Sequence, residues 1–185
     1  MLGANYANIT FNNCATLGEM GNPGSSMYSS YSGWSHGDSH TTLNNCYSAC
    51  TITEGTTIDG NCFTLTHGSG TNTFNNCYYL NLINKAQGTQ MSLEKFQSGE
   101  VCYKLNATQA EPVWFQTIGE DSFPVLNESH GIVILGDDGI YTGINEVVTS
   151  NNGQEPIGIY NLAGQRLSKM QKGINIVGQK KILIK

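Results

Sequence analysis

The chain has 185 residues, of which 38% are hydrophobic and only 12% are charged, with 22 glycines and four prolines. These proportions predict one large or two small folded domains with many turns, and they exclude collagen-like and disordered chains. The sequence has no run of eighteen apolar residues, so no transmembrane segment is predicted, and the N-terminus lacks the basic and apolar regions of a signal peptide.

Charge is distributed unevenly along the chain. Residues 1–155 contain all fourteen acidic side chains and three basic ones, whereas the last thirty residues contain six basic side chains and no acidic one. A basic tail could bind nucleic acid, but here the basic residues alternate with apolar ones in strand-like segments. We therefore predict no nucleic-acid partner.

A four-residue phrase occurs three times in the first half of the chain, at spacings of 32 and 31 residues. The copies are Phe11-Asn12-Asn13-Cys14, Leu43-Asn44-Asn45-Cys46 and Phe74-Asn75-Asn76-Cys77. A fixed period of this size is typical of stacked repeats, and the flanking Thr, Tyr, Phe and Ile residues favour strands. We predict an all-β fold in which residues 1–85 form a parallel β-helix, or solenoid, with further turns expected upstream.

The phrase also predicts a sharp corner. Its apolar residue should point inward, its first Asn outward, and its second Asn should lie at the bend, because Asn tolerates left-handed backbone angles. In register, the Asn side chains of successive turns would form a hydrogen-bonded ladder. The predicted corner residues are Asn13, Asn45 and Asn76, and the predicted internal column consists of Cys14, Cys46 and Cys77.

Cysteines on adjacent turns would lie about 4.8 Å apart, near the short end of the range for disulfides. A column of free thiols is therefore favoured, although disulfides remain an alternative.

An aromatic segment between the first two copies contains candidate ligand-binding residues, namely Tyr28, Tyr31 and Trp34. Exposed aromatic side chains on a rigid surface can stack on sugar rings or on partner proteins. Tyr28 and Tyr31 would face opposite sides of a regular strand, so part of this set should belong to the core.

His36, Asp38 and His40 are weak candidates for a metal site. On an extended strand these alternate residues share one face, where two imidazoles and a carboxylate could bind a divalent cation. The segment is rich in Gly and Ser, however, and a solvated turn fits it better. No metal and no cofactor are predicted.

The acidic residues of the repeat region do not recur at one position of the repeat, and no Lys or Arg precedes Lys85. Lyase and glycosidase chemistry needs acids and bases that converge on one surface. The chain itself is therefore predicted not to be an enzyme, and no catalytic residue is assigned.

After the repeats, residues 86–143 are predicted to form a cap. Residues 92–97 fit a short helix with Ser92 or Thr89 as N-cap and Gly99 as its stop, residues 101–105 a second helical turn or a strand, and residues 132–135 a strand. A helix across the end of a β-stack would cover its unpaired edge. Residues 144–156 are polar and turn-rich, and are predicted to be a linker.

The tail, residues 157–185, is predicted to form a small separate sheet from strands at 157–162, 165–169, 173–177 and 180–184. Three of its segments, Ile-Tyr-Asn-Leu-Ala-Gly-Gln-Arg-Leu at 159–167, Lys-Gly-Ile-Asn-Ile-Val at 172–177 and Lys-Lys-Ile-Leu-Ile-Lys at 180–185, closely resemble the end of type IX secretion sorting domains. Those domains end many surface and secreted proteins of Bacteroidetes-type bacteria. The matching positions are Tyr160, Asn161, Gly164, Arg166, Lys172, Gly173, Lys180 and Lys181.

Residues 99–126 also resemble a segment that follows Asn-Cys-Tyr repeats in large surface proteins of that group. The resemblance implies export across the outer membrane, with the type IX secretion machinery as partner and an extracellular or outer-membrane surface location. We therefore predict a non-catalytic stalk or adhesin-like module that contacts a glycan or a host or bacterial surface protein. The alternative is a carbohydrate-binding segment of a larger secreted enzyme that acts on polysaccharides.

Overall fold

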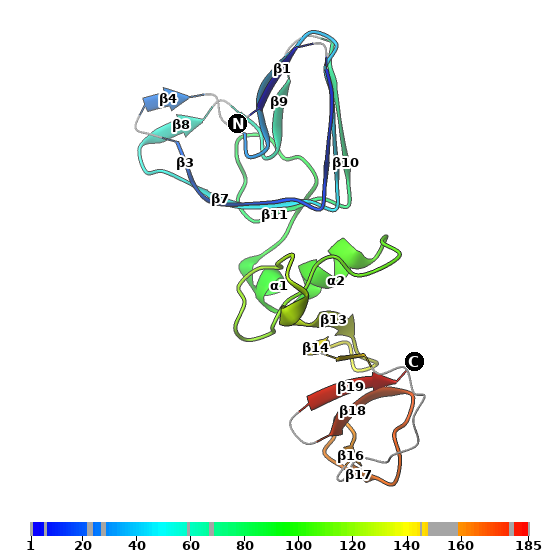
Figure 1. The fold of residues 1–185 in the computed structure, drawn as a ribbon. Coiled ribbons are helices and arrows are strands. Elements are labelled where there is room, and N and C mark those ends of the chain that lie inside the picture. The colour runs from blue at the N-terminus through cyan, green and yellow to red at the C-terminus, as the bar shows by residue number, and fades with distance from the viewer. Residues whose placement is uncertain are drawn as a thin grey trace.

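A computed structural model describes residues 2–5, 7–21, 24–26, 29–58, 60–66, 69–144, 146–147, 159–177 and 180–184. The described elements are mostly strands, and the few helices are short. Three parts follow one another along the chain and through space: a repeat region up to Gln90, a middle region up to Ile144, and a C-terminal sheet (Figure 1).

Three parallel sheets form the repeat region, one on each side of a roughly triangular outline (Figure 1). The first sheet consists of β1 (Leu2–Asn5), β5 (Ser32–His36) and β9 (Thr64–Thr66), and the second of β2 (Asn8–Asn12), β6 (His40–Asn44) and β10 (Thr71–Asn75). The third consists of β3 (Ala15–Met20), β7 (Tyr47–Ile52), β11 (Tyr78–Tyr79) and β12 (Thr89–Gln90). A further parallel pair, β4 (Gly24–Ser26) and β8 (Thr56–Ile58), projects from one corner.

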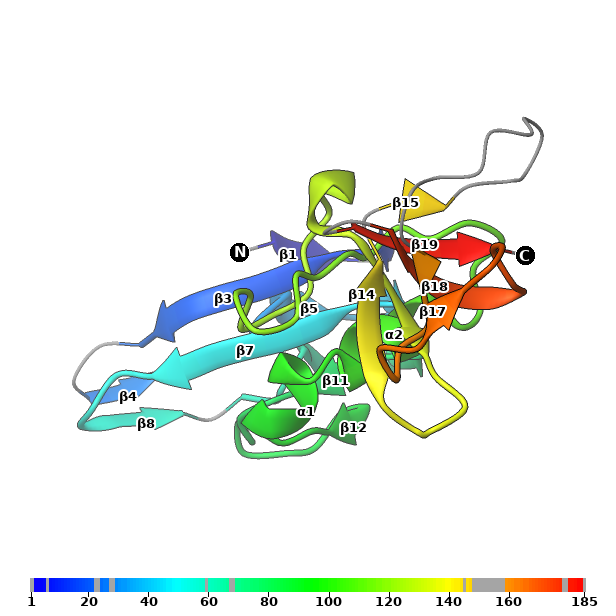
Figure 2. The same cartoon turned by 90° about the horizontal axis from the view of Figure 1, so that it is seen from below.

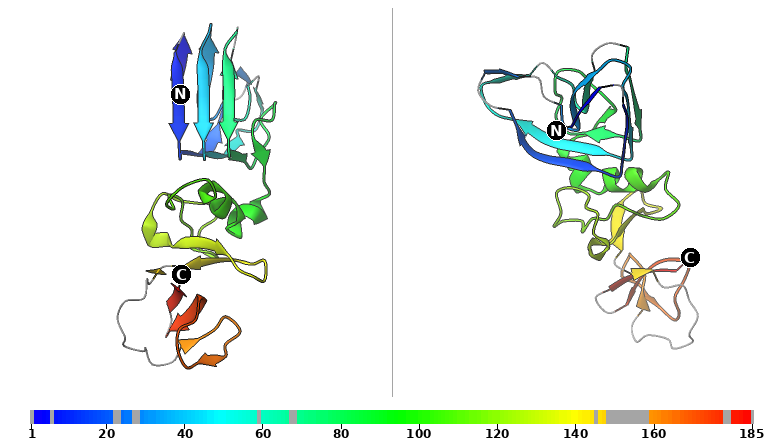
Figure 3. Two further views of the ribbon diagram at one scale, coloured as in Figure 1. Left: turned by 90° about the vertical axis from the view of Figure 1, so that its right-hand side faces the viewer. Right: turned by 45° about the horizontal axis from the view of Figure 1, so that its top comes forward.

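The predicted corners are confirmed. Asn13, Asn45 and Asn76 have left-handed backbones with φ of 52°, 52° and 53°. Each lies at the turn from the second sheet into the third, and Figure 3 shows the strands of the second sheet side by side. The three copies of the phrase are therefore equivalent in space as well as in sequence.

The predicted Asn ladder is also present. The Nδ2 of Asn44 donates to the Oδ1 of Asn12, and the Nδ2 of Asn75 donates to the Oδ1 of Asn44, both at 2.8 Å. Asn12, Asn44 and Asn75 are register partners in the second sheet. Parallel, in-register strands joined by such ladders are consistent with a solenoid-like architecture.

The cysteine column lies inside the stack, and all six cysteines are free thiols. The Sγ of Cys46 lies 3.4 Å from the backbone nitrogen of Cys14, and the Sγ of Cys77 lies 3.4 Å from the carbonyl oxygen of Leu43. Each of these sulfurs therefore contacts the preceding turn. Burial raises the pKa of Cys14, so its thiol stays protonated at neutral pH.

Residues 81–90 close the C-terminal end of the stack. The strand β12 pairs with β11, so the stack continues past the boundary at residue 85 that we expected. Gln87 substitutes for a strand beside β9, because its Oε1 accepts from the backbone N–H groups of Phe63 and Thr64 and its Nε2 donates to the carbonyl of Thr64. A single side chain thus satisfies backbone groups that another strand would otherwise bind.

The middle region contains two short helices, a 3₁₀ turn and an antiparallel strand pair. These are α1 (Leu93–Gln97), α2 (Glu100–Asn106), η1 (Glu128–His130), β13 (Ile132–Leu135) and β14 (Tyr141–Ile144). Ser92 caps α1 as predicted, since its hydroxyl accepts from the Lys95 N–H. Gly99 separates the helices at φ 89°, where a β-carbon would lie only 2.6 Å from a methyl group of Ile118. Residues 101–105, for which we predicted either a helical turn or a strand, lie in helix α2.

We expected a helix to lie across the end of the stack, but the structure places both helices elsewhere. They pack against the outer face of the third sheet, below β7 and β11 in Figure 1 and in front of them in Figure 2. Tyr47, Ala49 and Tyr78 point outward from that sheet and form one apolar cluster with Phe96 and Trp114 of the middle region. Because alternate strand residues face opposite sides, an outward row of apolar residues gives the sheet a second face to bury.

The C-terminal sheet has five strands in the order β15-β19-β18-β16-β17. They are β15 (Glu146–Val147), β16 (Ile159–Tyr160), β17 (Arg166–Leu167), β18 (Gly173–Val177) and β19 (Lys180–Ile184). The last four match the predicted tail strands. The added strand, β15, comes from the predicted linker and pairs in parallel with β19, while residues 145 and 148–156 of that linker lie outside the described part. The middle region lies between this sheet and the repeat region (Figures 1 and 3).

We predict that the left-handed backbone at Asn45 contributes to stability, and two substitutions at this position test it. Asn45→Ala removes the hydrogen bonds that Asn76 and Thr108 donate to its Oδ1, and it also places an unfavourable residue at positive φ. The free energy of unfolding should fall by about 2–3 kcal/mol. Asn45→Gly loses the same bonds but relieves the strain, so it should be about 1 kcal/mol less destabilising. Urea unfolding followed by circular dichroism measures both, and equal losses would contradict the role of the backbone angle.

Candidate functional site

The positions that resemble a sorting signal gather on the C-terminal sheet. Asn161 closes the turn between β16 and β17, where its Oδ1 accepts from the backbone N–H of Gln165 and its Nδ2 donates to the Oε1 of Gln165, both at 2.8 Å. Gly164 completes this turn with φ 76°. Tyr160 lies next to the turn and is exposed. The Asn161 side chain therefore holds this turn by two hydrogen bonds, and the neighbouring Tyr160 side chain is exposed.

The basic positions lie on the same sheet. Lys172 and Lys181 are exposed, and Gly173 begins β18 with φ 106°. Arg166 and Lys180 belong to β17 and β19, but their side chains are outside the described part. The backbone thus brings the resembling segments together, as four adjacent strands of one sheet.

Asn175 is a structural residue of this sheet that sequence reasoning missed. It is only 1% exposed, its Oδ1 accepts from the backbone N–H of Gln171, and its Nδ2 donates to the carbonyls of Gln171 and Gly173. These bonds hold the loop before β18 against the sheet. The available signal was a polar residue at the centre of the apolar stretch 173–177, since a buried amide needs hydrogen-bond partners.

The predicted aromatic ligand site is not formed by Tyr31. This side chain is 7% exposed, and its ring packs edge-on against Phe11 and Phe63 inside the stack. Its hydroxyl lies 2.5 Å from the carbonyl oxygen of Cys14 and 2.7 Å from that of Tyr47. Tyr31 is a core residue and is not available to a sugar ring. Trp34 lies on β5, but its side chain, like all of Tyr28, is outside the described part.

The candidate metal ligands lie around the bend that leads from β5 into β6. Asp38 accepts a hydrogen bond from Ser69, and the Nδ1 of His40 lies 2.6 Å from the Oγ1 of Thr71. Both bonds link the second turn to the third, so these side chains extend the inter-turn ladders. The side chain of His36 is not described, and within the described residues no three His, Cys, Asp or Glu side chains are grouped to hold a metal ion.

The corner residues also attach the middle region to the stack. The Nδ2 of Asn76 donates to the carbonyl of Lys104 in the last turn of α2, at 2.8 Å. The indole of Trp114 donates to the carbonyl of Asn45, and the hydroxyl of Tyr47 donates to the carbonyl of Pro124 at 2.7 Å. These polar bonds fix the position of the middle region over the third sheet.

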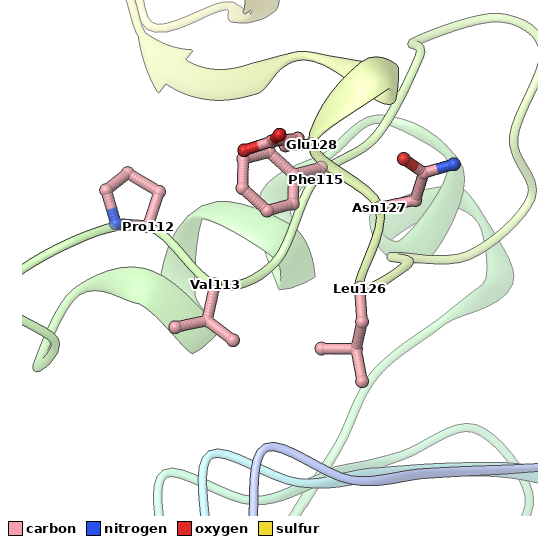
Figure 4. A pocket seen from close by; sticks show the side chains of 6 residues that line it. All are labelled: Pro112, Val113, Phe115, Leu126, Asn127 and Glu128. Atoms are coloured by element: carbon pink, nitrogen blue, oxygen red, sulfur yellow. The ribbon is translucent and has the colours of Figure 1, made fainter.

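An open pocket of about 490 Å³ lies on the middle region. Its lining consists of Pro112, Val113, Phe115, Leu126, Asn127 and Glu128. Figure 4 shows Val113 and Leu126 pointing toward the ribbons of the repeat region. The lining of this open hollow combines apolar side chains with one amide and one carboxylate.

Asp121 and His130 form a partly buried pair, and Asp121 also lines a second, smaller cavity. The Oδ2 of Asp121 accepts from the backbone N–H of Thr117 and from the Nδ1 of His130, both at 2.7 Å. Among the described residues no hydroxyl or thiol is hydrogen-bonded to the Nε2 of His130. The pair therefore joins two loops and does not activate a nucleophile.

Comparison with known proteins gives no relative for this chain. No protein-family model, no curated protein and no solved structure matches it. In the part of the chain that the structure describes, no helix has the length and apolarity needed to cross a membrane.

We predict a pH-dependent contribution from Asp121. Partial burial alone would raise the pKa of its carboxyl group, but the hydrogen bonds from Thr117 and His130 outweigh burial and lower this pKa below its ordinary value. A lowered pKa in the folded state means that the stabilisation is complete above the unfolded pKa, near 3.8, and is lost as the pH falls through the folded value.

Asp121→Asn should therefore lower the free energy of unfolding by about 1–2 kcal/mol at pH 7, because it weakens two charge-assisted bonds. The difference from the unsubstituted protein should shrink below about pH 4. Denaturant unfolding at pH 7, 5 and 3 measures this difference. A gap that stays constant across the three pH values would show that Asp121 contributes through packing and not through its charge.

Proposed function

We propose that the repeat region is a parallel β-helix and that it serves as a rigid stalk or adhesin-like module. Three features support this assignment: in-register parallel sheets, equivalent left-handed corners, and Asn ladders that join all three turns. In such a stack each turn is stabilised by its neighbours, so the unit is stiff along its axis. Stiffness and a repeated lateral surface suit a structural or adhesive role better than catalysis.

We further propose that the protein is a non-catalytic extracellular or cell-surface module whose C-terminal sheet is recognised by the type IX secretion machinery. The observation that carries this proposal is that the segments resembling a sorting domain form β16, β17, β18 and β19 of one sheet, with the middle region between it and the repeats. The side chains of Tyr160, Leu162, Lys172 and Lys181 are exposed and accessible to a receptor.

The export role can be tested by deleting residues 173–185 from the full chain. This deletion removes β18 and β19, which lie at the centre of the sheet and pair with β16 and β15. The repeat region makes its own sheets, so it should still fold, but the protein should remain in the periplasm of a Bacteroidetes-type host. Protease accessibility on intact cells measures surface delivery, and protease resistance of residues 7–90 in the purified variant checks folding.

A matched control replaces the exposed Leu135 of β13 by Ala, which leaves the C-terminal sheet intact and should not change delivery. Delivery of the deletion variant at the level of the full chain would exclude the sorting role.

A further inference from the structure

The pocket of the middle region lies between two segments of the chain that hydrogen bonds hold together. Side chains from residues 112–115 form one side of it, and side chains from residues 126–128 form the other (Figure 4). Phe115 and Val125 form a bridge in which the backbone N–H of each donates to the carbonyl of the other, at 2.8 and 2.9 Å. The separation of the two sides is therefore set by the backbone and not by a ligand.

Side-chain amides also fix the two sides of the pocket. Asn106 of α2 binds the first side, because its Oδ1 accepts from the N–H groups of Val113 and Trp114 and its Nδ2 donates to the carbonyl of Trp114 at 2.7 Å. On the second side, the Oδ1 of Asn127 accepts from the N–H and the hydroxyl of Ser129. A site that is already ordered loses little conformational entropy when a ligand binds.

The lining of the pocket is amphipathic. It consists of one aromatic ring, three aliphatic side chains, one amide and one carboxylate, which belong to Phe115, Pro112, Val113, Leu126, Asn127 and Glu128. Phe115 is half-buried and Leu126 is 56% exposed, so apolar surface is open to a ligand. Small-molecule sites of roughly 300–1,000 Å³ bind through apolar contacts and a few polar groups. A ligand for this pocket should therefore combine an apolar face with hydrogen-bonding groups.

Two polar groups of the lining are available to a ligand. Because its Oδ1 is held by Ser129, Asn127 presents its Nδ2 as a donor, and within the described part of the chain this group has no acceptor. The carboxylate of Glu128 is exposed and likewise has no donor among the described residues. The pocket thus offers an amide donor and a carboxylate acceptor.

The charge around the pocket is negative. Residues 105–144 contain six acidic side chains and no Lys or Arg. Glu128 belongs to the lining itself, so an anionic ligand would meet repulsion there. These charges disfavour sialic acids, uronic acids and other carboxylates, and they favour a neutral ligand.

We propose that this pocket binds a neutral N-acetylated sugar. The acetamido group of such a sugar carries one N–H donor, one carbonyl acceptor and a methyl group, which match the carboxylate of Glu128, the Nδ2 of Asn127 and the aliphatic side chains. The C–H face of the sugar ring packs against Phe115. The proposal rests on the adhesin-like role proposed above, to which it adds a ligand class, and it is independent of the export role.

Nuclear magnetic resonance titration of the ¹⁵N-labelled full chain tests binding. The probes are the methyl β-glycosides of N-acetylglucosamine and N-acetylgalactosamine, which differ only in the configuration of one hydroxyl group. At least one probe should cause saturable shifts of the Asn127 side-chain amide, with a millimolar dissociation constant. Methyl β-glucoside and methyl β-galactoside, which lack the acetamido group, should bind at least about tenfold more weakly, because two hydrogen bonds are lost. N-acetylmuramic acid, which adds a carboxylate to the glucosamine ring, should also bind more weakly.

Two variants separate the polar contacts. Asn127→Asp keeps the Oδ1 that accepts from Ser129 but removes the amide donor, and Glu128→Ala removes the acceptor. Each should weaken binding about tenfold. Glu94→Ala, at an exposed carboxylate of α1, should leave binding unchanged. Because all three side chains are exposed, the signals of residues away from the pocket should keep their positions, which checks that the variants fold.

The proposal is wrong if neither probe binds, if the glycosides without the acetamido group bind equally well, or if Glu94→Ala weakens binding as much as Glu128→Ala. Attachment of cells that display the full chain to a glycoprotein-coated surface measures the adhesin-like role on its own. Attachment that Glu128→Ala leaves unchanged would place the adhesive surface elsewhere. Neither result affects the sorting role, which is measured by surface delivery of the deletion variant.

Discussion

The left-handed corner at the second Asn of each phrase is the constraint on which the structure depends. Asn13, Asn45 and Asn76 bend the chain by the same angle at the same point of every turn, which keeps successive strands in register. Register in turn aligns the outward Asn side chains into a ladder and the cysteines into a column. The side chain of Asn76 and the carbonyl of Asn45 then anchor the middle region. One backbone conformation thus organises the interior, the surface and the attachment of the next part.

Tyr47 connects the two apolar cores. Its side chain belongs to the outer cluster with Phe96 and Trp114, while its carbonyl oxygen, on the backbone of the third sheet, lies 2.7 Å from the hydroxyl of Tyr31 inside the stack. A strand between two buried layers is stabilised on both faces, as in sheets covered by helices. The third sheet is therefore the central layer of the repeat and middle regions, whereas alternate residues of β2 and β10 in the second sheet are exposed.

Local chemistry explains what the sequence could predict. The corners, the Asn ladder, the thiol column, the Ser92 cap and the four tail strands follow from the conformational preferences of a few residues and from a fixed period. Features that depend on distant residues were missed. The packing of the helices on the third sheet required recognition of the outward row of Tyr47, Ala49 and Tyr78 as a second apolar face. Gln87 binds backbone groups of Phe63 and Thr64, which no local pattern identifies, whereas the signal for Asn175 was its polar side chain within an apolar stretch.

In two parts of the chain, a side-chain amide binds backbone groups that no neighbouring strand binds among the described residues. Gln87 closes the first sheet with one amide, and Asn175 satisfies the loop beside β18 with another. An amide suits both sites because it presents a donor and an acceptor together, as a peptide group does. The Asn ladder between the turns has a direction, because Asn75 donates to Asn44 and Asn44 donates to Asn12. The stack therefore has a direction along its axis, and the amide of Gln87 closes the end that lies beyond β9.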